Sequence, residues 1–132
     1  MIKSVTLYAD LMDPHCSEAQ SFLERQEIRL KVHDMRANPL DEQQLAGLIR
    51  HLNIRHFVNP ALAAGKRAKI EKVLQDRDEV IRMMAEDNEY VGRPLIVCGR
   101  LMTVGYSQTA LMDMLEIKSN GDTKGKGAEN AA

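Results

Sequence analysis

The sequence is poor in several residue types that define protein classes. Of its 132 residues only two are cysteine, none is tryptophan, and aromatic residues make up 4%. Two cysteines cannot build the disulfide framework of a small secreted domain, and so few rings argue against a base-stacking platform for single-stranded nucleic acid. No window approaches the roughly 18 apolar residues of a membrane span, and the opening residues lack the apolar stretch of a signal peptide. We therefore expect a cytoplasmic protein that is not in the membrane.

What is present fits one ordinary folded domain. Hydrophobic residues make up 44% of the chain, charged residues make up 28%, and the formal net charge is −1. This composition can fill one packed core, and its near-neutral charge does not favour direct binding of nucleic acid. Residues 118–132 are polar, rich in glycine and without periodicity. We expect a domain over 1–117 and a disordered polar tail over 118–132.

The first part of the chain has a β-α-β pattern. Residues 4–8 are short, apolar and β-branched, which is typical of a buried strand, and residues 28–35 alternate with a period of two. Between them Asp13 is suited to cap a helix that has Pro14 at its first position and continues to about residue 26. Such a helix connects two parallel strands by a right-handed crossover.

From about residue 40 to residue 90 the pattern is helical. The expected helices are 41–53, 60–74 and 78–85, the later strands are 94–98 and 101–104, and Ser107 caps a final helix. The order is therefore β-α-β, a helical block, and β-β-α. It predicts an α/β protein of thioredoxin-like fold, with a mixed four-stranded sheet and an inserted helical subdomain.

Three stretches of the sequence resemble one family. They are Val5 to Ile28 (VTLYADLMDPHCSEAQSFLERQEI), Asn59 to Arg93, and Gly92 to Tyr106 (GRPLIVCGRLMTVGY). Together they are similar to the family that contains the glutaredoxin-coupled arsenate reductases and the Spx-type transcriptional regulators. The likeness covers roughly residues 4–117, and the ending V-G-Y is closest to the Spx type.

The resemblance implies that the active-site loop is degenerate. In this family the nucleophilic cysteine lies five residues after the tyrosine of the first strand, and counting from Tyr8 gives Asp13. A cysteine there is activated because the helix N-terminus stabilises its thiolate, whereas a carboxylate cannot attack arsenate or a disulfide. Cys16 falls where dithiol members carry their second, resolving cysteine. The loop Asp13, Pro14, His15 and Cys16 thus resembles a dithiol site without its first thiol.

Two interpretations of this loop remain open. Asp13 is either a simple helix cap with Cys16 as a small buried residue, or Cys16 acts as a single reactive thiol beside His15, with glutathione as its partner. The histidines show no metal-ligand spacing around Cys16, so we expect no metal. Cys98 lies four residues beyond Pro94, roughly 13 Å along a strand, too far for a disulfide to a cysteine near Pro94. We expect Cys98 to be structural.

The anion site of the family is largely missing. Members that reduce arsenate hold it with three arginines, and the resemblance places these at Asn59, Arg93 and Tyr106, of which one is still an arginine. It also implies that Pro94 is a cis-proline facing the active-site helix. The retained Arg93 would bind a carboxylate such as that of glutathione, pair with Asp13, or lie solvated at an edge. We therefore expect no arsenate chemistry, and Arg93, Pro94 and Tyr106 are the candidate residues for binding a substrate or partner.

The helical block is also divided by charge. Residues 50–72 contain six lysines or arginines and one acid, whereas residues 73–89 contain six acids and two arginines. Such runs are usually solvated helix faces, and the alternative is a docking surface for a protein.

Two functions follow from these patterns. One is a regulatory or protein-interaction module, for which the Spx resemblance implies the C-terminal domain of the RNA polymerase α-subunit as partner. The other is a monothiol, glutaredoxin-like oxidoreductase that uses Cys16.

Overall fold

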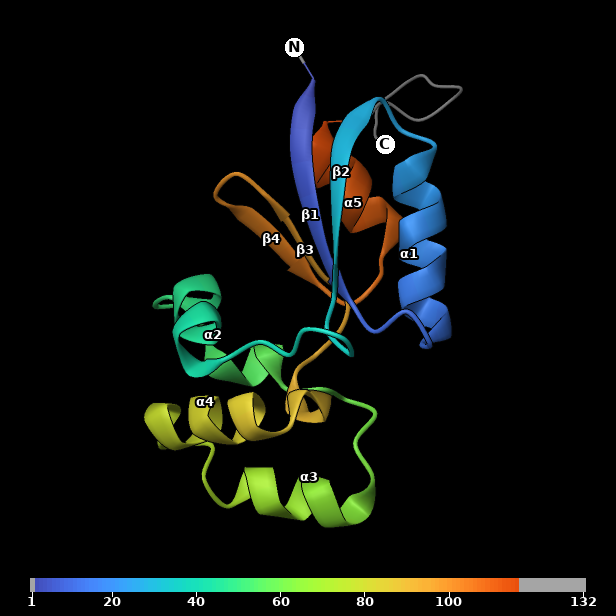
Figure 1. The fold of residues 1–132 in the computed structure, drawn as a ribbon. Coiled ribbons are helices and arrows are strands. Elements are labelled where there is room, and N and C mark those ends of the chain that lie inside the picture. Colours follow the sequence, from blue (N-terminus) through green and yellow to red (C-terminus); the bar gives the residue numbers. More distant parts are fainter. Residues whose placement is uncertain (1, 117–132) are drawn as a thin grey trace.

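A four-stranded sheet with helices on one face, and a block of helices at one end, form the molecule (Figure 1). The computed structural model describes residues 2–116, so the predicted tail 118–132 lies outside the described residues. The strands are β1 (Lys3–Ala9), β2 (Ile28–Asp34), β3 (Leu95–Cys98) and β4 (Leu101–Val104). The helices are α1 (Pro14–Glu24), α2 (Glu42–Ile49), α3 (Ala64–Glu71), α4 (Arg77–Glu86) and α5 (Gln108–Leu115), with short 3-10 helices at Ile54–Phe57 and Asn88–Tyr90.

The register of the sheet fixes which strand ends meet. The strand order is β2-β1-β3-β4; β1 and β2 are parallel, and the other neighbours are antiparallel. Ala9 at the end of β1 lies opposite Asp34 at the end of β2, and Tyr8 lies opposite Leu95 at the start of β3. Residues that follow β1, follow β2 or precede β3 therefore converge at one edge of the sheet. That edge faces the helical insertion (Figure 1).

Short polar residues cap several of the helices, and Asp13 and Ser107 do so as the sequence predicts. The Asp13 carboxylate accepts a hydrogen bond of 2.8 Å from the His15 amide, and Pro14 is the first residue of α1. Asp41 and Gln44 form a capping box on α2, and the Ser107 hydroxyl accepts from the Ala110 amide at the start of α5. Each of these caps satisfies an amide that the first helical turn leaves unpaired.

Two helices of the insertion are shorter than predicted, whereas α4 extends one residue beyond each end of the expected range 78–85. The expected helix 41–53 ends at Ile49, because Arg50 adopts a positive φ of 52° and the chain then forms a separate 3-10 turn capped by Asn53. The expected helix 60–74 is α3, which begins at Ala64 without a side-chain cap. A bridge between Val58 and Val91 also joins two segments for which no strand is predicted.

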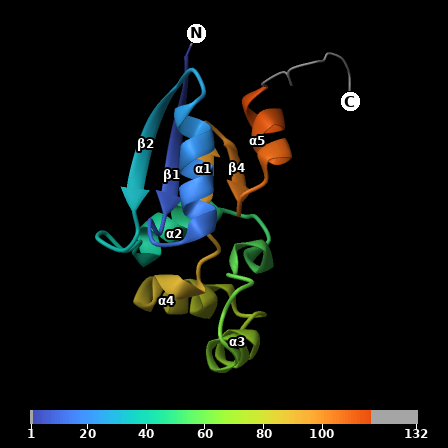
Figure 2. The same cartoon turned by 90° about the vertical axis from the view of Figure 1, so that its right-hand side faces the viewer.

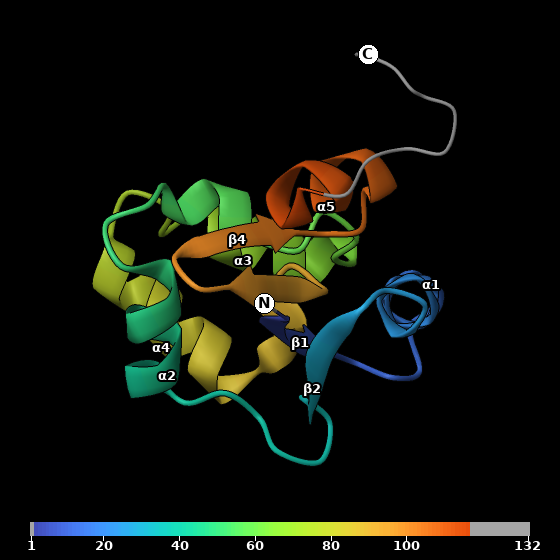
Figure 3. The same ribbon diagram turned by 90° about the horizontal axis from the view of Figure 1, so that it is seen from above.

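Two hydrophobic clusters hold these parts together. On β1 the alternate residues Val5, Leu7 and Ala9 pack against α1 and α5, which cover one face of the sheet (Figures 2 and 3). On β3, Ile96 joins that cluster and its neighbour Leu95 joins the cluster of the insertion. The strand thus presents one residue to each side. The predicted thioredoxin-like α/β fold with a helical insertion is confirmed.

The chain returns from the insertion to the sheet through a narrow point at Gly92. The Gly92 amide donates to the Phe57 carbonyl at 2.6 Å. A Cβ atom at Gly92 would lie 2.8 Å from a methyl carbon of Val104 and 3.3 Å from the Phe57 oxygen. Only a residue without a side chain fits this passage.

No helix in residues 2–116 is long and apolar enough to cross a membrane.

Candidate functional site

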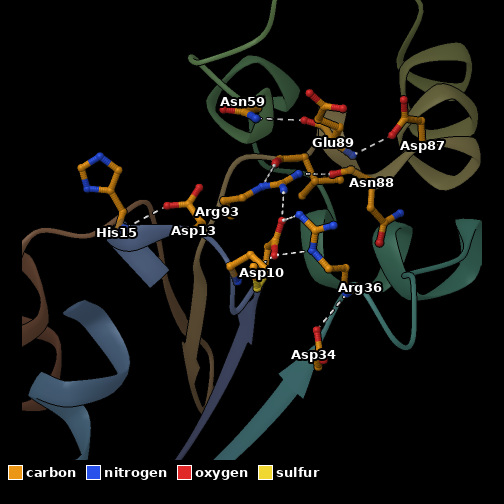
Figure 4. A network of polar contacts seen from close by, with 12 residues as sticks. Asp10, Asp13, His15, Asp34, Arg36, Asn59, Asp87, Asn88, Glu89 and Arg93 are labelled. Atoms are coloured by element: carbon orange, nitrogen blue, oxygen red, sulfur yellow. Dashed lines mark hydrogen bonds and ion pairs between the residues drawn. The ribbon is translucent and has the colours of Figure 1, made fainter. Parts of the chain in front are cut away.

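Asp10 is the centre of a charge cluster at the edge where the strand ends converge. It follows β1, while Arg36 follows β2 and Arg93 precedes β3 (Figure 4). The Arg36 Nε and Nη2 atoms lie 2.9 and 3.0 Å from the two Asp10 carboxylate oxygens, and Arg93 Nη1 lies 3.3 Å from Oδ2. The cluster joins three segments that are far apart in the sequence.

The two inner members of this cluster are shielded from water. The side chains of Asp10 and Arg93 are 12% and 11% exposed, whereas that of Arg36 is 64% exposed. The hydrogen bonds from Arg36 hold the pKa of Asp10 below its ordinary value; burial opposes this shift, and the Met12 amide assists it. Asp10 is therefore a carboxylate at neutral pH, and it balances the buried guanidinium of Arg93.

The remaining donors of Arg93 are bound to the backbone. Its Nε donates to the Val91 carbonyl at 3.2 Å, and its Nη2 donates to the Asn88 carbonyl. Two of the alternatives for Arg93 are wrong. It does not pair with Asp13, whose carboxylate caps α1, and it is not solvated, because it is largely buried and paired with Asp10. The Arg93–Pro94 bond is cis, as the resemblance implies.

An open cavity of about 460 Å³ lies beside the cluster. Its charged lining consists of Asp10, Asp13, Asp87, Glu89, Arg36 and Arg93. Carboxylates outnumber guanidinium groups four to two in this lining, and Asp10 is bound to both arginines. Lys66, which pairs with Asp87 and Glu89, offsets part of this excess, and the remaining negative charge does not favour an oxyanion.

The other two positions that correspond to the family's arginines carry no cation. Asn59 lines the cavity, but its amide donates to the Glu89 carbonyl at 2.9 Å and accepts from the Ala61 amide at 2.9 Å. Tyr106 is not part of the cavity lining; its ring packs against that of Phe22 with 6.4 Å between centroids. Neither side chain therefore supplies a positive charge to the cavity.

The predicted loop residues lie at the head of α1, but the sulfur is hidden. Cys16 has no exposed surface, and this burial is the largest cause that raises the pKa of its thiol to about 11. His15 is exposed and lies 3.7 Å from Glu18. Cys98 is half-buried on β3, and both cysteines are free. A thiol with such a pKa is protonated at neutral pH, which weighs against a reactive Cys16.

The main residue that sequence reasoning missed is Asp10. The sequence patterns predict no role for it. The topology of the sheet could have indicated it. Asp10 and Arg36 are charged residues that each follow one of two parallel strands, and such residues lie at the same edge of the sheet. The residue before the third strand, Arg93, reaches that edge because β3 is antiparallel.

The fold and site together define a thioredoxin-like protein with an ArsC-type helical insertion and no exposed thiol at the head of α1. A putative ArsC family related protein from Bacteroides fragilis is similar, with a TM-score of 0.72, 21% identity, and coverage of 85% of this chain and 98% of that one. An arsenate reductase from Vibrio cholerae also matches with a TM-score of 0.72, at 21% identity over 89% of this chain and 99% of that one. This chain therefore has the fold of arsenate reductase-like proteins.

Similarity in sequence alone is weaker. An uncharacterized 15.7 kDa protein in the draG 3' region of Rhodospirillum rubrum is 25% identical over 83 residues, which is 63% of this chain and 58% of that relative. No family model matches the chain.

Proposed function

We propose that this chain is a regulatory or protein-interaction module on an arsenate reductase-like fold, and that it does not reduce arsenate. The observation that carries the proposal is the contact between Asp10 and Arg93. The carboxylate of Asp10 binds the guanidinium of Arg93, the group to which the resemblance assigns an oxygen of arsenate. Because the carboxylate belongs to the chain, an incoming oxyanion must displace it against the attraction of two arginines.

The chemistry of the loop supports the same proposal. Reduction of arsenate by a thiol needs an accessible thiolate that forms a bond to arsenic. The N-terminus of α1 instead carries the carboxylate of Asp13, which accepts a hydrogen bond from the His15 amide. The alternative function, a monothiol oxidoreductase, requires a thiolate at Cys16, and a thiol pKa of about 11 leaves little of it at neutral pH.

The resemblance to Spx-type regulators suggests one partner to test first. We infer that the chain acts in the cytoplasm, and the C-terminal domain of the RNA polymerase α-subunit is the first candidate. The cavity side of the molecule is suited to contact a protein, because Leu11 and Met12 beside it are 40% and 76% exposed. Exposed apolar residues of this kind often mark protein contacts.

The loss of anion chemistry is tested by binding and turnover. The purified chain is titrated with arsenate and with phosphate by NMR, and it is assayed for arsenate reduction with glutathione and glutaredoxin. We expect neither binding nor turnover. Asp10→Asn removes the competing charge and should gain weak anion binding at Arg36 and Arg93. Turnover by the unaltered chain would overturn the proposal.

The interaction role is tested separately. The chain carrying a photo-cross-linker at Met12 is incubated with the purified α-subunit domain, with a chain labelled at Ser21 on α1 as matched control. A cross-link from position 12 alone supports this partner. If neither this domain nor a cell extract gives a stable complex with the chain, the interaction role is wrong.

A further inference from the structure

We propose that the groove between α3 and α4 binds an acidic segment of a partner protein through one apolar side chain and flanking carboxylates. The groove has a volume of about 460 Å³ and lies on the insertion, where α3 is the helix farthest from the sheet (Figure 1). This inference rests on the proposed interaction function and adds a surface and a partner chemistry to it.

Within the described part of the chain, two of the four basic side chains that line the groove form ion pairs, and the other two do not. Lys66 Nζ lies 2.6 Å from both Asp87 and Glu89, and Arg82 is held by Glu79 and Glu86 on its own helix. The other two cations of the lining, Lys69 and Lys72, are exposed and have no ion pair within residues 2–116. Two adjacent positive charges therefore remain available to a ligand on the α3 side.

The floor of the groove is apolar. It contains Val73 and Met83, which are half-buried, and the ring of Tyr90, over which Lys66 Nζ lies at 5.8 Å from the centroid. A volume of about 460 Å³ is within the range of about 300–1,000 Å³ typical of ligand pockets. Methionine adapts to differently shaped apolar groups and is common at surfaces that bind peptides. The floor thus offers a place for one large apolar side chain.

The arrangement favours an acidic protein over nucleic acid. A phosphate backbone would place negative charge beside Glu86 and Asp87, which line the α4 side of the groove, and it would bring no apolar group to the floor. A peptide can hold its carboxylates at Lys69 and Lys72 while its apolar side chain enters between the helices. Opposite charges at the rim then set the orientation of the segment.

The test uses a short fluorescein-labelled peptide in which aspartates and glutamates flank one phenylalanine. Binding is measured by fluorescence anisotropy with the full chain, with Lys69→Glu/Lys72→Glu, and with Arg29→Glu/Lys31→Glu as matched control. The control reverses two exposed cations on β2, away from the groove. Circular dichroism verifies that all variants fold, which is expected because all four lysine and arginine side chains are exposed.

We expect the groove variant to weaken binding at least about tenfold and the β2 variant to leave it within about twofold. Replacing the phenylalanine of the peptide by serine should weaken binding, and so should Met83→Ser in the protein. The proposal is overturned if the unaltered chain does not bind the acidic peptide. Equal binding by both charge variants, equal binding of a peptide with lysines in place of the acids, or tighter binding of a single-stranded oligonucleotide would also overturn it.

A further comparison separates this proposal from the interaction function itself. If the groove variant still cross-links to a partner through Met12 as strongly as the unaltered chain, the interaction function stands and the groove proposal falls. If cross-linking is lost in the groove variant and retained in the β2 variant, both are supported.

Discussion

Two three-membered charge clusters of the molecule lie in very different surroundings: one has a single carboxylate and two arginines, and the other has a single arginine and two carboxylates. In the first, Asp10 binds Arg36 and Arg93 across 26 and 83 positions of sequence, with two side chains almost fully shielded from water. In the second, Arg82 binds Glu79 and Glu86 within one helix, and all three side chains are substantially exposed. The first cluster connects the ends of three strands. The second lies on the exposed side of α4, a helix whose apolar face is already packed in the core of the insertion.

From this difference in burial we expect the two clusters to contribute differently to the stability of the fold. In water, an exposed pair gains little because solvent screens it and two long side chains lose freedom. In the shielded cluster, removal of one partner leaves a charge that water cannot reach. Variants of the two clusters can therefore be ranked by the loss of stability that each should cause.

The largest effect is expected for Asp10→Ala. This change leaves the buried guanidinium of Arg93 without its carboxylate, and loss of a buried partner costs about 3 kcal/mol, at the lower end of the usual range because Arg36 can turn to solvent. Urea unfolding at pH 7 measures the free energy of unfolding. A loss below about 1 kcal/mol would equal that of an exposed ion pair, and the two clusters would then not differ in their contribution to stability.

Replacement of a half-buried polar residue without charge should cost an amount of stability between those expected for the two clusters. The Asn88 side chain accepts from the Leu40 amide at 2.6 Å and donates to the carbonyls of Leu40 and Met84 at 3.1 and 2.8 Å. Asn88→Ala leaves these groups unpaired and should cost about 2 kcal/mol. The same unfolding assay measures this value, and Asn38→Ala, at an exposed position, is the matched control that should change little.

Acid should weaken the shielded cluster selectively. Since the pKa of Asp10 is lower in the folded chain than in the unfolded chain, its charge stabilises the fold above the unfolded pKa of about 3.9, and that contribution is lost as the pH falls through the folded pKa. Unfolding measured from pH 6 to pH 2 should therefore show a steeper loss of stability for the unaltered chain than for Asp10→Asn. If stability fell equally with pH in both proteins, the ionised Asp10 carboxylate would contribute nothing to stability through its arginines.

The smallest effect is expected for Arg82→Ala. Because the pairs with Glu79 and Glu86 are exposed, their removal should leave the unfolding midpoint almost unchanged and independent of added salt. A shift comparable to that of Asp10→Ala would contradict the ranking by burial.

Local signals were enough to predict much of the fold. Alternation and β-branching identified all four strands, and Asp13 and Ser107 were recognised as helix caps because capping depends on neighbouring residues. The break at Arg50 was missed because its positive φ is accompanied by a contact with a distant turn, where its Nη2 donates to the Arg100 carbonyl at 3.2 Å. Helix lengths in the insertion depend on such tertiary contacts, which periodicity does not contain.

The site was less accessible to sequence reasoning for the same reason. The resemblance directed attention to Arg93, but the partners it suggested, glutathione or Asp13, did not include the carboxylate that binds it. The partner is Asp10, a residue whose role exists only after β1, β2 and β3 are aligned in register. The burial of Cys16 likewise depends on how α1 rests on the sheet.

The passage at Gly92 has a consequence for the cavity on its other side. Glu89 and Arg93, which line that cavity, flank the glycine in the chain. A methyl group at position 92 would overlap the Val104 side chain and crowd the Phe57 carbonyl, so that one of these neighbours or the chain at position 92 would have to move. A residue that is not in the cavity lining thus constrains the course of the chain between two residues that are.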